Sequence, residues 1–568
     1  MTSFEIERLA FEPDVVGGMD GLHERFHDWP VVYTIDDTKK VYIGESQHVS
    51  RRMSQHLSNP EKQGLRTVRV VVDDTFNRSA CHDLESTLIR WFSGDQQLKV
   101  LNKNIGLTNA NYYRREDYQK TFEKIFDALR AEGLFRSSIQ EIENNDLFKL
   151  SPYKALNPEQ DFVIEAIMDG LVEDLEAQRK SLSIVQGDPG TGKTVVGIYL
   201  LKLLCDIAEH DGEEDESLNS PFSDYFVDGT RQLFKDLRIG IVVPQGSLRS
   251  SISKVIKNTP ALRNVEVLNA FKVGDSSERW DILVVDEAHR LTQYAAQSTG
   301  VLVARYRKIS TRLFGEPLDK DKNQLDWIRA QAKHTILLLD TEQAVRPADI
   351  ETEAFTGAID EARRDSRLFR LHSQMRVAGG NDYIRFVREL LSDEPPSAVP
   401  DFGDYDFRVF TDLSEMISEL KMREQEVQLS RLVAGYAWDW VSRHDKDKTD
   451  ISIGEVSLRW NSVKNDWINS SNAVNEVGSI HTVQGYDLNY TGVIIGGDLR
   501  RDPESRKLWV DEENYRDPAG KQDNNLRERI TTSDDLLRYI RNVYAVLMTR
   551  GMRGTYVYAT DPGVLGVS

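Results

Sequence analysis

The apolar residues of this 568-residue chain fall into short continuous runs that alternate with amphipathic stretches. The strand-like run Ile184-Val185-Gln186, for example, is followed by a helical pattern at residues 195–204, and apolar runs recur at 239–243 and 282–285. Strands that are apolar at every position and separated by helices are typical of parallel sheets covered on both faces. The pattern therefore predicts α/β domains with doubly wound, mainly parallel sheets from about residue 155 onward.

A different pattern occupies the first part of the chain, where short strands with polar turns are mixed with helices. Two strand-like runs within PVVYTIDDTKKVYIGES are followed by a helix, a strand, a helix and a last short strand, at residues 48–59, 66–73, 81–94 and 98–104. This order predicts a small α+β domain at residues 28–110. Residues 1–27 are expected to be an N-terminal extension, and residues 111–154 a helical linker between domains.

A phosphate-binding loop is predicted where the first buried strand of the α/β region ends. The spacing matches G-x-x-x-x-G-K-[ST], and chance would produce it in such a chain only on the order of once in a hundred. Glycines let backbone N–H groups close around a triphosphate, while Lys193 reaches the β- and γ-phosphates and Thr194 holds Mg²⁺. The residues expected to bind nucleotide are Gly187, Asp188, Pro189, Gly190, Thr191, Gly192, Lys193 and Thr194.

Acidic and basic residues that could complete an ATPase site follow later strands. Asp286 and Glu287 end an apolar run; Asp286 is expected to hold Mg²⁺ through water and Glu287 to polarise the attacking water. A further run ends in Asp340 and Gln343, which are positioned to sense the γ-phosphate. Arg376 is a candidate arginine finger.

Composition and charge limit the classes of function. Hydrophobic content of 39% and charged content of 29% describe an ordinary globular protein, and the length predicts two to four domains. A net charge of −20 argues against coating nucleic acid by bulk attraction, although a local basic groove is compatible with it. Tyr306 lies within one basic stretch that could grip a nucleic-acid backbone or could be a solvated helix face; its charged members are Arg305, Arg307, Lys308 and Arg312.

The chain has two cysteines, Cys81 and Cys205, and no run of 18 apolar residues. Two cysteines form neither a disulfide framework nor a cysteine zinc site. We therefore expect a reducing compartment, most simply the cytoplasm, and no membrane partner.

The small N-terminal domain resembles GIY-YIG nucleases over about residues 28–110. The residues that carry the resemblance are Tyr33, Tyr42-Ile43-Gly44, Arg52, His56, Glu85 and Asn102. The resemblance implies a phosphodiesterase site built from Tyr33, Tyr42, Arg52, His56, Glu85 and Asn102, with Mg²⁺ or Mn²⁺ at Glu85. One departure is that the first signature reads Val31-Val32-Tyr33 and lacks its glycine.

Elementary chemistry supports the same residues. Arg52 and His56 are four positions apart, so they share one helical face and combine a fixed positive charge with a group able to move protons near neutral pH. A carboxylate such as Glu85 can hold one divalent ion, and a tyrosine hydroxyl can orient or deprotonate water. The alternative is a retained fold that only binds.

The region after residue 155 resembles superfamily 1 helicases, and its sequence motifs are similar to those of the Schlafen-type family over about residues 155–563. The carrying stretches are VAGYAWDW, RWN, HTVQGYDL and LMTRGMRGTYVY. The resemblance implies two RecA-like domains, residues 155–365 and 366–568, with ATP between them. It further implies that Gln160 reads the adenine edge, that Gln484 and Gly485 couple nucleotide to nucleic acid, and that Arg550 is a second arginine finger.

Together these patterns predict an ATP-dependent DNA helicase or translocase fused to a Mg²⁺-dependent endonuclease, acting in restriction, anti-phage defence or repair. Single-stranded or forked DNA is the expected partner. Two alternatives are an RNA-directed helicase-nuclease and a nucleic-acid-binding ATP switch whose nuclease-like domain is a docking module.

Overall fold

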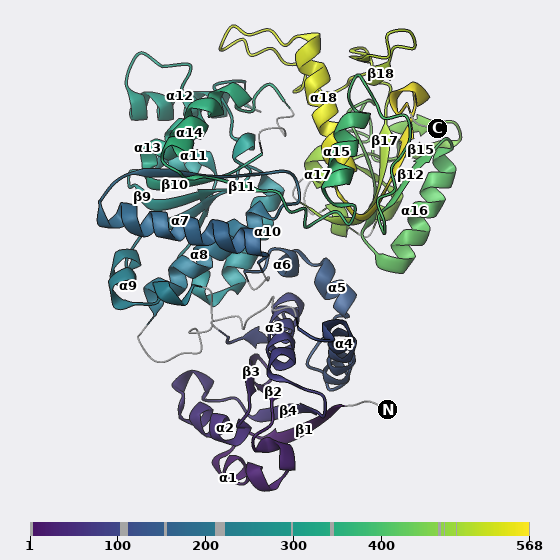
Figure 1. Ribbon diagram of the computed structural model, residues 1–568. Coiled ribbons are helices and arrows are strands. Elements are labelled where there is room, and N and C mark those ends of the chain that lie inside the picture. Colours follow the sequence, from purple (N-terminus) through teal and green to yellow (C-terminus); the bar gives the residue numbers. More distant parts are fainter. Residues whose placement is uncertain are drawn as a thin grey trace. The chain divides into compact units, whose positions relative to one another are not determined.

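The computed structural model describes residues 4–102, 112–152, 156–210, 222–296, 299–340, 346–463, 467–470, 472–483 and 486–566 (Figure 1). The chain forms two compact units, and each is described by itself. The first consists of residues 1–165, 198–236 and 254–263; the second consists of residues 166–197, 237–253 and 264–568. In the part of the chain that the structure describes, no helix is both long and apolar enough to cross a membrane.

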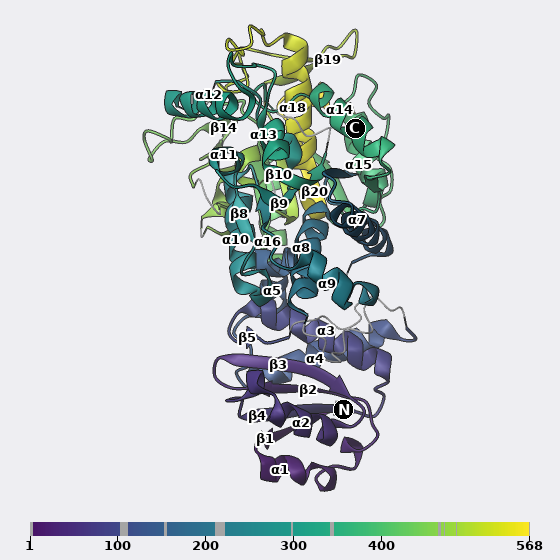
Figure 2. The same cartoon turned by 90° about the vertical axis from the view of Figure 1, so that its left-hand side faces the viewer.

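The first unit contains a five-stranded sheet in the order β1-β4-β2-β3-β5. Its strands are β1 (Phe4–Ala10), β2 (Val31–Asp36), β3 (Lys40–Ser46), β4 (Thr67–Asp73) and β5 (Lys99–Val100). Neighbouring strands are antiparallel except for β3 and β5, which run parallel. Both views of the molecule show β1 to β4 side by side (Figure 2). Strands β2 to β5 confirm the predicted order.

Both faces of this sheet are covered, which explains why β2 is buried along its whole length. Because side chains alternate across a strand, Val32 packs on one face, while Val31, Tyr33 and Ile35 pack on the other. Helix α3 (Arg78–Asp95) packs on the face that carries Val32, and α2 (Val49–Ser58) packs on the face that carries Tyr33. Helix α2 and the short helix α1 (Pro13–Gly17) therefore cover the face of the sheet on which Tyr33 packs.

The limits of this domain differ from those expected from the pattern. The extension, residues 1–27, supplies β1, which pairs with β4 along seven residues. The supposed linker supplies α4 (Arg115–Ala131), whose Phe122, Ile125 and Phe126 share one core with α3. An amphipathic helix must bury its apolar face, and the nearest apolar surface here is that of α3. Two shorter helices follow, α5 (Ile139–Asn144) and α6 (Asp146–Lys149).

The second unit contains a six-stranded parallel sheet in the order β11-β6-β10-β9-β7-β8. Its strands are β6 (Ser181–Gly187), β7 (Ile239–Val242), β8 (Glu266–Leu268), β9 (Trp280–Val285), β10 (Ala332–Leu339) and β11 (Leu368–Leu371). Strand β11 lies beyond residue 365, where the first RecA-like domain was expected to end, and pairs directly with β6. The boundary between the sheets therefore follows residue 371.

Helices connect the strands of this sheet, as parallel pairing requires. They are α8 (Lys193–Glu209), α10 (Gly246–Asn258), α11 (Ala270–Asp275), α12 (Gly300–Phe314), α13 (Gln324–Gln331) and α14 (Thr352–Arg364); α7 (Pro158–Glu176) precedes β6, and α9 (Asp228–Phe234) precedes β7. The apolar core beneath β6, β9 and β10 includes Ile184, Leu283 and Leu337. These strands carry the predicted phosphate loop and acidic residues at their carboxyl ends.

A second parallel sheet follows, in the order β12-β20-β17-β13-β16. Its strands are β12 (Asp406–Phe410), β13 (Ser430–Ala434), β16 (Val477–Gly478), β17 (Leu488–Ile495) and β20 (Gly551–Ala559). Helices α15 (Gly380–Leu390), α16 (Leu413–Val427), α17 (Ile480–Val483) and α18 (Ser533–Met548) belong to this part of the chain. The structure is thus a mixed α/β protein with two parallel sheets, as the sequence predicts.

Two small antiparallel hairpins lie in the chain between strands of the second parallel sheet. They are formed by β14 (Ile451–Ile453) with β15 (Val456–Leu458) and by β18 (Leu499–Arg501) with β19 (Leu508–Val510). Helix α18 begins at a capping box in which Thr532 and Asp535 satisfy each other's backbone N–H groups. This cap defines the start of the helix that leads to Arg550.

Candidate functional site

The predicted phosphate loop connects β6 to α8. Gly190 and Gly192 have φ angles of +88° and +82°, a backbone conformation that side chains with a Cβ rarely adopt. The Lys193 Nζ donates hydrogen bonds to the carbonyl oxygens of Gly187 at 2.5 Å and Asp188 at 2.9 Å. The ammonium is therefore folded back over its own loop, where phosphate oxygens could replace these carbonyl acceptors.

Residues suited to a divalent ion lie beside this loop. Thr194 Oγ1 donates to Asp286 Oδ2 at 3.0 Å, and the Glu287 backbone N–H donates to Asp286 Oδ1 at 3.0 Å. Burial and the neighbouring Glu287 carboxylate raise the pKa of Asp286 to about 7. Hydroxyl and carboxylate oxygens are the ligands that Mg²⁺ prefers, and a buried carboxylate gains from a cation. Thr194 and Asp286 therefore fit a magnesium site.

Glu287 is held as a carboxylate by positive neighbours. Its backbone φ of +50° turns the chain immediately after Asp286. The His289 Nε2 lies 2.9 Å from Glu287 Oε2. Burial by itself would raise the pKa of Glu287, but His289, Lys193 and Arg550 together hold it below its usual value. An ionised carboxylate is the form that can accept a proton from water.

The loop after β11 lies directly against the phosphate loop. Gln374 Nε2 donates to the Pro189 carbonyl at 2.7 Å, and the Met375 N–H donates to the Gly190 carbonyl at 2.9 Å. A Cβ placed on Gly190 would overlap Gln374 Oε1. Sequence patterns do not indicate these contacts, since nearly two hundred residues separate the partners.

The two predicted arginine fingers belong to the same electrostatic cluster as Glu287. Arg376 forms an ion pair with Asp487. Burial and Arg376 lower the pKa of Arg550 to about 9, while Glu287 and Asp487 act in the opposite direction. Arg550 is fully enclosed and donates to the Val546 carbonyl at 3.3 Å. The two guanidinium groups and the Glu287 carboxylate therefore lie close enough to influence one another electrostatically.

Some predicted residues cannot be placed in this cluster. Gln343, Gln484 and Gly485 lie outside the described residues. Gln160 is buried, and its amide oxygen accepts from the Asn157 N–H at 3.1 Å, which forms the start of α7. Gln160 belongs to the first compact unit, and its role at the adenine edge stays a prediction.

The basic stretch on α12 is largely engaged with the protein. Tyr306 is only 1% exposed and packs on Trp327, so its ring cannot stack on a base in this conformation. Arg305 Nε donates to Asp275 at 2.7 Å, and Arg312 donates to the carbonyl of Gly274. Of the two possibilities for this stretch, the structure favours a helix face paired with its neighbours.

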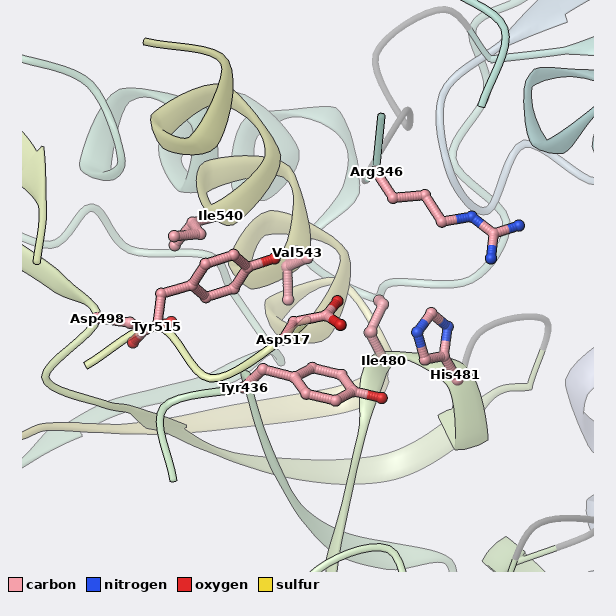
Figure 3. A pocket seen from close by; sticks show the side chains of 9 residues that line it. All are labelled: Arg346, Tyr436, Ile480, His481, Asp498, Tyr515, Asp517, Ile540 and Val543. Carbon is pink, nitrogen blue, oxygen red and sulfur yellow. The ribbon is translucent and has the colours of Figure 1, made fainter. Parts of the chain in front are cut away.

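A small cavity of about 10 Å³, room for about one water molecule, lies between Arg346 and the His481 segment (Figure 3). Arg346 Nε and an Arg290 guanidinium nitrogen both donate to the buried Asp349 carboxylate, at 2.9 and 2.7 Å. Burial and these two arginines lower the pKa of His481 to about 3, so its ring is neutral. Arg290 follows Asp286-Glu287-Ala288-His289, and this connection to His481 was not apparent from sequence.

A second cluster occurs in the N-terminal domain. Tyr33 on β2 places its Oη 2.7 Å from His56 Nε2 on α2, and Lys62 Nζ lies 2.6 Å from His56 Nδ1. The same Nζ lies 3.3 Å from the centre of the Tyr42 ring. Burial, Lys62 and Arg52 lower the pKa of His56 to about 2. The structure therefore brings four aromatic or basic groups together, and sequence reasoning missed Lys62.

Gly44 explains how these side chains fit. A Cβ at this position would overlap the Tyr33 hydroxyl, so a residue without a side chain is required where Tyr33 crosses β3. Asn102 fixes the same strand from the other side, because its Nδ2 donates to the Ile43 carbonyl at 2.7 Å and its Oδ1 accepts from the Ile43 N–H at 3.0 Å. Asn102 therefore acts here as a support for β3.

Glu85 lies on α3 in a group with His82 and Glu45. His82 Nδ1 is 3.9 Å from Glu85 and its Nε2 is 3.7 Å from Glu45. The neighbouring Glu85 carboxylate raises the pKa of His82, and Glu45 acts in the same direction against burial. Among the described residues, no group of three or more histidine, cysteine or acidic side chains is arranged to hold a metal ion. A divalent ion at Glu85 would therefore need water and substrate oxygens as further ligands.

One parallel sheet carries a phosphate loop and an acidic strand end, and a second parallel sheet follows it. Together with Arg376 on the loop between the sheets and Arg550 before β20, these features define a helicase-like P-loop protein. The Schlafen group 3, DNA/RNA helicase domain family matches residues 180–561, which is more than half of the chain. The chain therefore belongs to the Schlafen group 3 DNA/RNA helicase domain family. The match begins after the N-terminal domain and does not cover it.

The individual proteins that match this chain share low sequence identity with it. An uncharacterised protein of Saccharomyces cerevisiae is 24% identical over 440 residues, which cover 72% of this chain and 89% of that protein. A crystal structure of Pif1 helicase from Bacteroides, in complex with ADP-AlF3 and ssDNA, is 10% identical, with a TM-score of 0.26. That comparison covers 72% of this chain and 94% of the Pif1 chain.

Proposed function

We propose that this protein is an ATP-hydrolysing helicase or translocase that acts on nucleic acid. The observation that carries the proposal is the joining of Thr194 to Asp286 beside the phosphate loop, within a chain of the Schlafen group 3 helicase family. The electrostatic interactions of Arg550 with Arg376 and with Glu287 support the proposal further.

Each of these side chains has a distinct task in hydrolysis. Lys193 exchanges its carbonyl acceptors for phosphate oxygens, and Thr194 and Asp286 would hold Mg²⁺, which neutralises phosphate charge when bound. Glu287 accepts the proton of the attacking water. Arg376 and Arg550 stabilise the charge that develops on the transferred phosphoryl group.

Arg376 lies on the loop that connects the two parallel sheets, and Arg550 directly precedes β20 of the second sheet. Hydrolysis therefore requires the two sheets to take up one particular arrangement. A nucleic acid strand that favours this arrangement would accelerate hydrolysis, and each turnover would move the strand relative to the protein. Single-stranded or forked DNA is our preferred substrate, and RNA is the alternative within the same mechanism.

The test is an ATPase assay with labelled single-stranded DNA, duplex DNA, forked DNA and matching RNA, each with and without Mg²⁺. We expect single strands to stimulate hydrolysis, salt to weaken the stimulation, and Lys193→Ala to lose orders of magnitude in rate. Lys421→Ala, on an exposed position of α16, is the matched control. Parent-rate hydrolysis by Lys193→Ala would refute the site, and indifference to every nucleic acid would favour an ATP switch.

A second function, phosphodiester cleavage, is proposed for the N-terminal domain because Tyr33, Tyr42 and His56 meet around one point. Arg52, four residues before His56, supplies fixed positive charge, and Glu85 would hold Mg²⁺ or Mn²⁺. A motor joined to a nuclease suits restriction, anti-phage defence or repair.

Plasmid nicking in Mg²⁺ or Mn²⁺ tests this second function. Glu85→Gln should abolish metal-dependent nicking and leave ATPase unchanged, whereas Glu123→Gln, exposed on α4, should behave as the parent. Equal nicking by parent and Glu85→Gln would contradict the assignment and favour a docking role for this domain.

A further inference from the structure

Lys62, His56 and Tyr33 form a continuous chain of contacts in the N-terminal domain. The Lys62 Nζ is 2.6 Å from His56 Nδ1, and His56 Nε2 is 2.7 Å from Tyr33 Oη. All three side chains are buried, with exposures of 8%, 3% and 0%. Water therefore competes little for these contacts, and the protonation of one group determines that of the next.

The direction of these hydrogen bonds follows from which atoms of Lys62 and His56 can donate a proton. An ammonium group carries donors and no acceptor, so a charged Lys62 can bond His56 Nδ1 only if that nitrogen is unprotonated. A neutral imidazole then carries its single proton on Nε2, and this N–H points at Tyr33 Oη. Tyr33 therefore accepts from His56, and its own proton is directed elsewhere.

A second contact holds Lys62 in place. The ammonium lies 3.3 Å from the centre of the Tyr42 ring, and that ring meets the His56 ring edge-on with centroids 4.9 Å apart. Attraction between a cation and an aromatic face is strongest when both are desolvated. The short helix Pro60–Lys62 begins at Asn59, whose side chain accepts from the Glu61 N–H at 2.8 Å, so the backbone that carries Lys62 is also anchored.

We propose that Lys62 is a positioning residue that holds His56 as its Nε2-protonated tautomer and so makes the Tyr33 oxygen a hydrogen-bond acceptor. This proposal rests on the proposed nuclease function of the domain. The N–H that the Tyr33 oxygen receives from His56 stabilises negative charge on that oxygen. Once Tyr33 has released its own proton to bulk solvent, the phenolate held by this N–H can accept a proton from the attacking water.

Two charged groups, Lys62 and Arg52, act on His56. Its ring also contacts the Tyr33 hydroxyl and meets the Tyr42 ring edge-on. Arg52 is bonded to Gln55 at 3.1 Å on the same helix. Of these groups, Lys62 is the one that touches Nδ1. Removing its charge should therefore change the tautomer, while Arg52 remains as the second positive charge.

The first test reads the tautomer of His56 directly in the full-length protein, by ¹⁵N NMR of labelled histidine rings, with His56→Gln used to assign the signal. We expect a protonated Nε2 and an unprotonated Nδ1 in the parent and in Lys62→Arg. In Lys62→Met, which keeps the stem but lacks the charge, the Nδ1-protonated form should appear. The same tautomer in parent and Lys62→Met, or a protonated Nδ1 in the parent, would overturn the proposal.

The second test follows the pH dependence of metal-dependent nicking. Lys62→Met should lose about 10–100-fold in rate near neutral pH, as is typical when a supporting hydrogen-bond partner is removed, and should recover part of the loss at higher pH. Lys62→Arg should restore the parent profile, and Lys124→Met, exposed on α4, should not alter it. A uniform loss at every pH in both Lys62 variants would indicate a purely structural role.

Failure of the nuclease function and failure of this proposal have different outcomes. If the parent does not cleave any nucleic acid, the nuclease function fails, whereas the NMR experiment still decides the tautomer. A thermal melt of Lys62→Met that matches the parent's shows that the N-terminal domain of the variant is folded.

Discussion

Thr194 Oγ1 lies 3.0 Å from Asp286 Oδ2, a contact that joins the first turn of α8 to the end of β9 across 92 residues. It exists because β6 and β9 are both hydrogen-bonded to β10, so their carboxyl ends open at the same edge of the sheet. The contact brings a hydroxyl and a carboxylate within reach of one cation beside the phosphate loop.

The first prediction concerns this contact. Thr194→Val removes the hydroxyl at nearly constant volume, so we expect Mg²⁺-dependent ATPase to fall by about 10²–10³ in kcat, the usual cost of losing one preorganised electrostatic partner. Steady-state ATPase across a Mg²⁺ titration measures it, and Thr38→Val, in an exposed turn, is the control. An unchanged Mg²⁺ dependence would separate Thr194 from the metal site.

The second prediction concerns Arg376, which lies on the loop that contacts Pro189 and Gly190. Arg376→Ala should lower kcat by about 10³-fold or more and leave ATP binding nearly intact, because an arginine finger acts on charge that develops during transfer. Fluorescent-nucleotide binding and single-turnover hydrolysis distinguish the two effects. Arg385→Ala, exposed on α15, should retain parent kinetics; equal kcat in both variants would exclude Arg376 from catalysis.

The third prediction concerns pH and His481, which faces Arg290, Arg346, Asp349, Tyr436 and Asp517 around the small cavity. Its pKa is about 3 in the folded chain and about 6.5 when unfolded, so between these values only the unfolded chain binds the proton. Stability contributed by the neutral ring is therefore complete above pH 6.5 and falls as pH falls, by on the order of 2 kcal/mol at pH 5.

Thermal melts at pH 7.5 and pH 5 measure this contribution. The parent should lose more stability than His481→Gln on acidification, because glutamine binds no proton. His444→Gln, at an exposed histidine, should follow the parent. An identical pH response of the parent and His481→Gln would show that burial of His481 does not control acid stability.

The fourth prediction concerns Gly44 in the N-terminal domain. Gly44→Ala places a methyl group against the Tyr33 hydroxyl, so we expect about 1–3 kcal/mol of destabilisation or a displaced Tyr33, with loss of nicking in either case. Melting curves and plasmid nicking detect these changes. Gly17→Ala, which has open space around it at the end of α1, should be close to neutral. Normal nicking by Gly44→Ala would show that Tyr33 need not stay in place.

Much of the architecture followed from the chain alone, since its signals are local. The phosphate loop, the acidic pair after β9 and the order of strands and helices depend on neighbouring residues and on short periodicities. These signals predicted the parallel sheets and placed Thr194 and Asp286 at strand ends. The family match supports the same assignment for residues 180–561.

Partners distant in sequence were decided only by the tertiary structure. The pattern of β1 does not say that it pairs with β4, and the apolar face of α4 does not say that it packs on α3. Domain limits drawn at residues 28, 111 and 365 therefore differ from those of the folded chain. Such pairings depend on sheet register and on which apolar surface is closest, and neither is written in a short segment.

The difference between local and distant signals also explains which residues of the two sites could be recognised from sequence. Tyr33, His56 and Lys193 were recognisable because each belongs to a signature with fixed spacing. Lys62 became part of the site only when a turn placed its ammonium against His56 and Tyr42, and Gln374 met Pro189 only when β11 joined β6. The sequence by itself determined which side chains are candidates for chemistry. The packing of distant elements decided which other side chains contact them, because hydrogen bonds act over about 3 Å whatever the separation along the chain.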